Sequence, residues 1–124
     1  MSEWARRFED LEVFRRAYRL SLEVHRTSLE FPRIEQFALA DQVRRASKSI
    51  CANIAEGFDG GSDAEIRRFL RMSKRSATEL QSHLYVALDQ RYVGPKEFKE
   101  LYDLAAEAQR LVGGFIRYLR GEAG

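Results

Sequence analysis

The sequence has few of the residues that build covalent cross-links or metal clusters. It contains one cysteine, Cys51, and two histidines, His25 and His83. A lone cysteine forms no internal disulfide, and a zinc site needs several Cys or His ligands at short spacings. A ferritin-like di-iron site needs Glu-x-x-His pairs, whereas Glu79 precedes His83 by four residues. We therefore expect neither a metal site nor a cofactor.

Long hydrophobic runs are also missing, although 44% of the residues are hydrophobic. The longest runs are a few residues, against the ~20 that a helix needs to cross a bilayer, so we expect no membrane association. Residues 1–8 are charged and lack the apolar stretch of a signal peptide, which predicts a cytoplasmic protein. The two prolines, Pro32 and Pro95, leave long segments rich in helix-favouring residues.

No pattern typical of a catalytic centre is present. No glycine-framed turn presents an activated serine, and Cys51 has no histidine beside it in the sequence. The pair Gly60 and Gly61 lacks the Lys-Ser/Thr that completes a phosphate-binding loop. We predict no catalytic residues and a protein that is not an enzyme.

Hydrophobic periodicity predicts one all-α domain, residues 1–124, with helices at about 10–29, 39–58, 63–91 and 95–120. Short connections between such helices predict an antiparallel up-down-up-down four-helix bundle. The first helix carries a candidate core stripe of Leu11, Phe14, Ala17, Tyr18, Ser21, Val24, His25 and Ser28. The third shows the heptad spacing of a bundle seam in Ile66, Leu70, Ser73, Ala77, Leu80, Leu84 and Ala87.

The segment from Gln42 to Gly57, QVRRASKSICANIAEG, is the most informative in the chain. Its apolar residues recur at helical spacing and predict a core helix whose outward flank holds Arg44, Arg45 and Lys48. Asn53 and Glu56 lie near the end of this helix, and Gly57 is a plausible helix stop.

The same segment resembles the signature of the 23S rRNA intervening-sequence proteins, also called the S23 ribosomal protein family. The likeness rests on SIxxNIAEG at residues 49–57, preceded by FPRIEQFALADQVRRA and followed by a Gly-rich turn and EIRRFLRMSKRSATEL. It extends from about Leu11 to Leu119. The resemblance implies a four-helix bundle that forms a ring-like homo-oligomer, characteristically a pentamer, and it assigns no reaction.

Asn53 and Glu56 match the family motif and are polar residues that need an explanation. An amide in or beside an apolar stripe must find hydrogen bonds or destabilise the fold. We expect Asn53, Glu56 and Gly57 to form a structural motif that fixes helix pairing or the following turn. Contact with a ligand or partner is the alternative.

Basic residues make the strongest functional pattern. Arg67, Arg68, Arg71, Lys74 and Arg75 follow i, i+1, i+4, i+7, i+8 and lie along one ridge of the third helix. If this ridge adjoins Arg44, Arg45 and Lys48, eight cations share one surface that binds several phosphates. The alternative is a solvated face partly neutralised by Asp41, Asp63, Glu65 and Glu79.

Large aromatic residues outside the seams indicate self-association. A thin bundle leaves much of their surface exposed, and contiguous exposed apolar area usually marks an interface. The alternative is that these rings cap the bundle ends. The residues concerned are Phe31, Phe37, Phe69, Tyr85, Tyr92, Tyr102 and Tyr118.

Together these patterns predict a non-enzymatic homo-oligomeric module that binds structured RNA, preferentially ribosomal RNA, through its basic face, with DNA as the less favoured partner. The net charge of +2 is nearly neutral, so the binding surface must be local. The chain also resembles the accessory proteins of diversity-generating retroelements, which are basic pentameric bundles that partner a reverse transcriptase and its template RNA. The third hypothesis is a protein–protein scaffold that binds no nucleic acid.

Overall fold

The computed structural model describes residues 5–121, and within that range it contains helices and no strand. The predicted all-α class with four helices is confirmed. The element bounds are η1 (Phe8–Asp10), α1 (Glu12–Ser28), η2 (Arg33–Glu35), α2 (Leu39–Phe58), α3 (Asp63–Asp89) and α4 (Pro95–Leu119). Each helix begins and ends within two residues of its predicted bounds, and α2 matches them.

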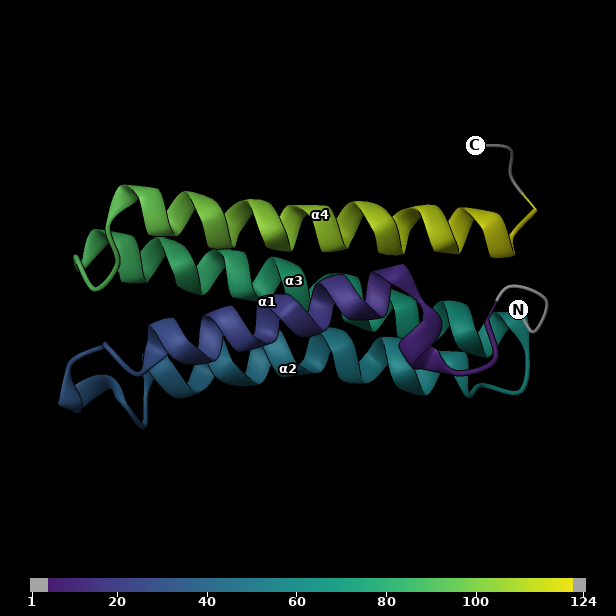
Figure 1. The fold of residues 1–124 in the computed structure, drawn as a ribbon, viewed down its shortest axis with the longest axis horizontal. Helices are drawn as coiled ribbons and strands as arrows, with labels where there is room; N and C mark the ends of the chain where they lie inside the picture. The colour runs from purple at the N-terminus through teal and green to yellow at the C-terminus, as the bar shows by residue number, and fades with distance from the viewer. Residues whose placement is uncertain (1–4, 122–124) are drawn as a thin grey trace.

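The four helices lie side by side along the long axis of the molecule (Figure 1). The α1–α2 and α3–α4 connections share one end of the bundle, and the α2–α3 turn lies at the other end together with the last turn of α4. This arrangement places the beginning of α3 beside the end of α4, which matters for the basic residues described below.

The core runs between the helices as the heptad pattern predicts for α3. All seven predicted seam residues of α3 are buried, from Ile66 at one end to Ala87 at the other. In α2 the buried side chains include Val43, Ile50 and Ile54. At about 25 cal/mol per Å² of apolar area removed from water, such a seam is the main stabilising contribution to the bundle.

The predicted core stripe of α1 is wrong at two of its eight positions: Leu11, Ala17, Val24 and Ser28 are buried, Phe14 and Ser21 are partly buried, and the other two are exposed. Tyr18 is 50% exposed and His25 is exposed, whereas the buried face consists of Val13, Ala17, Leu20, Val24, Thr27 and Ser28. The physical reason is that α1 has two apolar stripes, and the second, with Tyr18, Leu22 and Leu29, points outward. Periodicity shows both stripes but does not show which of them the other helices cover.

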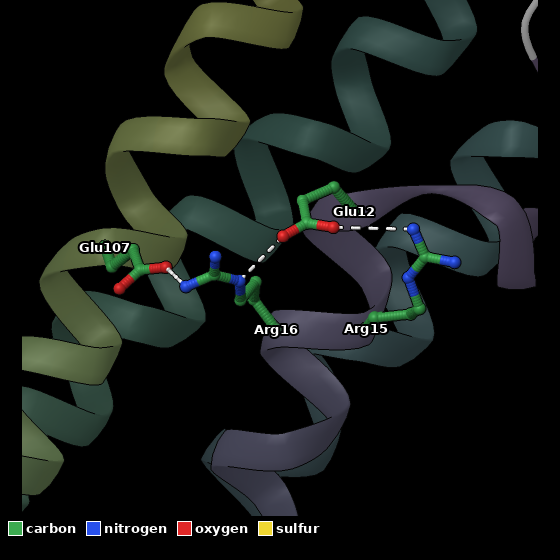
Figure 2. A network of polar contacts seen from close by, with 4 residues as sticks. All are labelled: Glu12, Arg15, Arg16 and Glu107. Carbon is green, nitrogen blue, oxygen red and sulfur yellow. Dashed lines mark hydrogen bonds and ion pairs between the residues drawn. The ribbon is translucent and has the colours of Figure 1, made fainter.

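A polar network ties α1 to α4 at the surface (Figure 2). The Arg16 guanidinium donates a hydrogen bond from Nε to Glu12 Oε1 at 2.8 Å and forms an ion pair with Glu107 of α4. Hydrogen bonds from Arg16 and then Arg15 hold the pKa of Glu12 below its ordinary value. The stabilisation from this carboxylate is therefore present at neutral pH and is lost as the pH falls through the lowered pKa.

Helices α2 and α3 approach closely at the end of α2. A Cβ added to Gly57 would lie 3.1 Å from the Phe69 Cβ and 3.4 Å from the Ile66 carbonyl oxygen, both on α3. Gly57 lies inside the last turn of α2, which ends at Phe58 and has no residue with positive φ at its cap. Gly57 was expected to stop the helix; its small size instead permits close packing of two helices.

Replacing Gly57 with valine should destabilise the fold by about 1–3 kcal/mol, because the branched side chain forces α2 and α3 apart. The matched control is Gly61→Val, since an added Cβ at Gly61 meets nothing within 4 Å. Chemical denaturation of both variants measures the difference. Equal stabilities would contradict the packing role of Gly57.

Candidate nucleic-acid interface

Arg44 is not part of an outward basic flank. Its guanidinium is partly buried and donates from Nη1 to Ser28 Oγ at 2.8 Å and from Nη2 to the Gln36 carbonyl oxygen at 2.7 Å. These bonds join α2 to the end of α1 and to the connection between them. The prediction for Arg44 is corrected: its charge is used inside the fold, because position 44 lies on the α1 side of α2.

The other two predicted cations of α2 are exposed. Arg45 donates from Nε to Asp41 Oδ2 at 2.8 Å, so this pair neutralises itself on its own helix. Lys48 is exposed, one turn further along α2. Thus α2 contributes less positive surface than its three basic residues suggest.

Three cations of α3 border a groove shared with α4. Arg71, Lys74 and Arg75 line this groove, which has a volume of about 410 Å³, and Arg120 lines it from α4's C-terminal cap position. The remaining lining residues are Thr78 and Ile116. Every charged residue of this surface, which we call the basic groove, is therefore a cation.

The side chains between the helices explain why α3 shares its cations with α4. The Ser73 hydroxyl donates to the Ile50 carbonyl oxygen at 2.8 Å, so that flank of α3 faces α2. On the other flank, Gln109 of α4 donates from Nε2 to Thr78 Oγ1 at 2.8 Å. Lys74 and Arg71 lie one and two turns from Thr78 on the α4 side. The groove thus unites α3 with α4, and the joint surface of α2 and α3 stays a prediction.

The remaining predicted cations of α3 lie beside this groove. Arg67 is half-buried one turn before Arg71, and Arg68 is exposed with its guanidinium carbon 4.7 Å from the centre of the Phe69 ring. Such a contact orients the guanidinium without neutralising it. The basic face of α3 therefore runs from Arg67 to Arg75, over about two turns of the N-terminal half of the helix.

Two arginines on the last turn of α4 add to the basic surface and are absent from the sequence-based prediction. Arg120 lines the groove, and the Arg117 guanidinium lies near Gly113, as does the ammonium of Lys74. Their i, i+3 spacing on the last turn was the available signal. The end of α4 lies at the same end of the bundle as the start of α3 (Figure 1), and the basic ridge lies on that part of α3.

Acidic residues do little to neutralise the ridge. Glu79 lies 3.6 Å from Nε2 of His83, and Asp41 pairs with Arg45. Across residues 5–121, no ion pair joins Arg71, Lys74 or Arg75 to a carboxylate. By contrast, arginines 15, 16 and 26 of α1 all pair with glutamates. These arginines of α1 are thus paired with acidic residues, whereas Arg71, Lys74 and Arg75 of α3 are not paired within the described range.

Asn53 stabilises the α2–α3 contact through serines. Its Nδ2 donates to the Ser49 carbonyl oxygen at 2.9 Å and to Ser49 Oγ at 3.0 Å. Ser49 Oγ in turn lies 2.8 Å from Ser76 Oγ on α3. The buried amide thus supports a hydrogen-bonded link between two helices, which is the structural use expected for it. Glu56 is exposed and lines a shallow surface depression with residues of the N-terminal segment.

The rest of the described chain holds no other recognisable centre. Within residues 5–121, no three His, Cys, Asp or Glu side chains gather in a way that would hold a metal ion. None of the described helices combines the length and apolar character needed to cross a membrane. Burial raises the pKa of the Cys51 thiol, which disfavours the reactive thiolate.

Comparison with known proteins agrees with the motif in α2. A model of the 23S rRNA-intervening sequence protein family matches residues 9–114. The chain belongs to this family. A protein of unknown function from the S23 ribosomal protein family of Bacteroides thetaiotaomicron VPI-5482 has the same fold in its crystal structure. It is 18% identical, with a TM-score of 0.77, and the match covers 85% of this chain and 98% of that one. No curated protein matches the chain.

We predict that two adjacent arginines of this family member contribute very differently to its free energy of unfolding. Arg44→Ala should lower the free energy of unfolding by about 2 kcal/mol, because it leaves Ser28 and Gln36 without their charged donor. Arg45→Ala should change it by less than about 0.5 kcal/mol, since an exposed pair on one helix contributes little. Urea unfolding of both variants makes the comparison, and a neutral Arg44→Ala would refute the structural role.

Proposed function

We propose that this protein is a non-enzymatic cytoplasmic module that binds structured RNA through the basic groove and the adjoining face of α3. The observation that supports this most is a groove in which every charged residue is a cation. Membership of a family named for a 23S rRNA intervening sequence makes ribosomal RNA the preferred partner.

The charge arrangement favours a polyanion over a small anion. Arg67, Arg71 and Arg75 are four residues apart, so their backbone positions span about 12 Å along α3 at 1.5 Å per residue. A nucleic-acid strand carries several phosphates over that distance. Cations with no acidic partner among residues 5–121 are also those whose counterions are released on binding, which favours association entropically.

The groove lining favours recognition of shape over base sequence. No aromatic side chain lines the groove, so unstacked bases find no stacking platform there. Its flexible cations contact the phosphate backbone, whose path depends on how the RNA is folded. This is the basis for preferring structured RNA.

We further propose that the chains assemble as antiparallel bundles into a ring, a pentamer by analogy with the family. Ile34 is 84% exposed and Phe37 is 95% exposed, both in the connection between α1 and α2. Exposed apolar residues of this size usually mark an interface. Among the aromatic residues predicted to lie outside the seams, Phe31 is buried and packs on Tyr92, as expected for rings that cap the bundle end. Phe37, by contrast, is exposed to solvent.

The connection that holds Ile34 and Phe37 is rigidly braced. Gln36 donates from Nε2 to the carbonyl oxygens of Ser28 and Phe31, both at 2.9 Å. The Tyr92 hydroxyl donates to Glu35 Oε2 at 2.9 Å. A loop ordered before binding loses little conformational entropy on assembly, so its apolar residues suit a docking contact.

Reversing the charge of three ridge residues should abolish RNA binding. The variant Arg67→Glu, Arg71→Glu, Arg75→Glu should lose at least about a hundredfold in affinity for a labelled ribosomal RNA hairpin, because each residue replaced removes a phosphate contact. Fluorescence anisotropy at several salt concentrations measures both the affinity and its salt dependence.

The matched control reverses three exposed cations elsewhere, Arg19, Arg33 and Lys96, which changes the net charge equally. Circular dichroism checks that both variants keep their helices. If both variants lost RNA affinity equally, the change in net charge alone would explain the loss. RNA binding that is absent in the unchanged protein would favour the scaffold, and binding only in the presence of a reverse transcriptase would favour the accessory role.

The assembly proposal is tested by Ile34→Ser, Phe37→Ser, which removes the exposed apolar surface and leaves the bracing side chains in place. We expect a fall in mass from the oligomer to the monomer, measured by light scattering after size exclusion. The control is Leu22→Ser on the outward stripe of α1. An unchanged mass for the double variant would place the interface elsewhere.

A further inference from the structure

Three aromatic rings gather where α3 meets α4, beyond the end of the basic groove. The centre of the Tyr85 ring of α3 lies 5.0 Å from the centre of the Phe98 ring and 5.6 Å from that of the Tyr102 ring, both of α4. The centres of the Phe98 and Tyr102 rings are 5.4 Å apart. Tyr85 is 51% exposed and the other two rings are partly buried. We call this cluster of three rings the aromatic platform.

The aromatic platform and the basic groove belong to one stripe on the same helix pair. Arg71, Thr78 and Tyr85 are seven residues apart, a spacing that returns each side chain to nearly the same side of α3. Gln109 and Tyr102 are seven residues apart on α4, and Gln109 donates to Thr78 Oγ1 across the pair. The stripe therefore begins with cations, passes the Thr78–Gln109 hydrogen bond and ends on the rings.

The length of this stripe suits a short stretch of nucleic acid. Thr78 lines the groove, and Tyr85 lies seven residues further along α3, which corresponds to about 10 Å at 1.5 Å per residue. A strand whose phosphates lie on the groove cations covers that distance within a few nucleotides. Proteins that bind unpaired strands combine cations that follow the phosphates with aromatic rings on which bases stack. The platform thus supplies the rings that the groove itself lacks.

The two tyrosines of the platform are neutral and support each other. A hydrogen bond with Tyr85 raises the pKa of the Tyr102 hydroxyl, so Tyr102 stays uncharged at neutral pH. The neighbouring carboxylate of Asp103 is paired with Lys99 Nζ at 2.7 Å. Rings that are already packed together lose little conformational entropy when a ligand stacks on them.

We propose that the aromatic platform of Tyr85, Phe98 and Tyr102 stacks an unpaired base of the RNA strand whose phosphates lie on the basic groove. This inference rests on the proposed RNA binding and specifies the class of RNA: a folded RNA with an unpaired nucleotide beside its helix. Aromatic rings stack on any base, so the platform selects for an unpaired nucleotide and not for a base sequence.

The cations of the stripe favour an RNA strand over a second copy of this chain. Charged residues are depleted at the centre of protein–protein interfaces. Here the rings continue into a groove lined by Arg71, Lys74 and Arg75, none of which pairs with a carboxylate among residues 5–121. A second copy that covered the rings would crowd these cations, whereas an RNA strand neutralises them.

The test uses Tyr85→Leu, which keeps an apolar side chain beside the other two rings but removes the stacking surface. Fluorescence anisotropy measures binding to two labelled forms of the same ribosomal RNA hairpin, one blunt and one with a single-stranded extension. Tyr85→Leu should weaken binding of the extended hairpin about tenfold, as expected for the loss of one stacked base, and leave binding of the blunt hairpin unchanged. Tyr85→Phe keeps the ring and should bind both hairpins as the unchanged protein does.

The dependence of affinity on salt separates stacking from charge. Stacking releases no counterions, so Tyr85→Leu should lower the affinity by the same factor at every salt concentration and leave the salt slope unchanged. The matched control is Tyr18→Leu, because Tyr18 lies on α1, is 50% exposed and stacks on Phe14. Circular dichroism checks that each variant keeps its helices.

An equal loss of affinity for the blunt and the extended hairpin, or an equal loss in Tyr18→Leu, would overturn the platform. A lower oligomer mass of Tyr85→Leu in light scattering would also overturn it, because the rings would then belong to a contact between copies. If Tyr85→Leu bound the extended hairpin normally while Arg67→Glu, Arg71→Glu, Arg75→Glu abolished binding, the platform would fail and the proposed function would stand. If the unchanged protein bound neither hairpin, the proposed function itself would fail.

Discussion

The arrangement of this molecule depends on the contact between α2 and α3. Apolar residues supply most of the free energy along the seam, but apolar surfaces slide past one another with little penalty. Hydrogen bonds between helices resist such sliding, because a slip of one helical turn would leave buried donors unpaired. The Ser73 hydroxyl on the Ile50 carbonyl and the link from Asn53 through Ser49 to Ser76 therefore set the register of the two helices. No buried side-chain nitrogen or oxygen in the described range lacks a partner.

That register determines which side of α3 is available to α4. With Ser73 facing α2, Lys74 and Thr78 turn toward α4, and the cations at the start of α3 meet the last turn of α4. The basic groove is thus a consequence of helix pairing and not of local sequence alone. The same reasoning accounts for Arg44, whose position on the α1 side of α2 places it among polar groups of the chain itself.

The sequence predicted the helices well because their signals are local. The Ser62 hydroxyl accepts a hydrogen bond from the Glu65 backbone N–H at the start of α3, and Pro95 lies in the first turn of α4, as their positions in the sequence indicate. The seam of α3 was also predictable, because it is the only strong stripe on that helix. On α1 two stripes compete, and which one is buried depends on the other three helices. Arg117 was not predicted for a similar reason: it lies near Lys74, which is distant in sequence, only because α3 and α4 pack together.

The braced connection between α1 and α2 has a consequence for the life of a single chain. Ile34 and Phe37 are held in water by hydrogen bonds that do not depend on any other molecule. A newly made chain therefore exposes this apolar surface as soon as it folds, and local rearrangement of the braced connection does not bury it. Quality-control chaperones and proteases recognise exposed apolar groups of this kind. The cellular lifetime of the protein should accordingly depend on how quickly that surface is covered after synthesis.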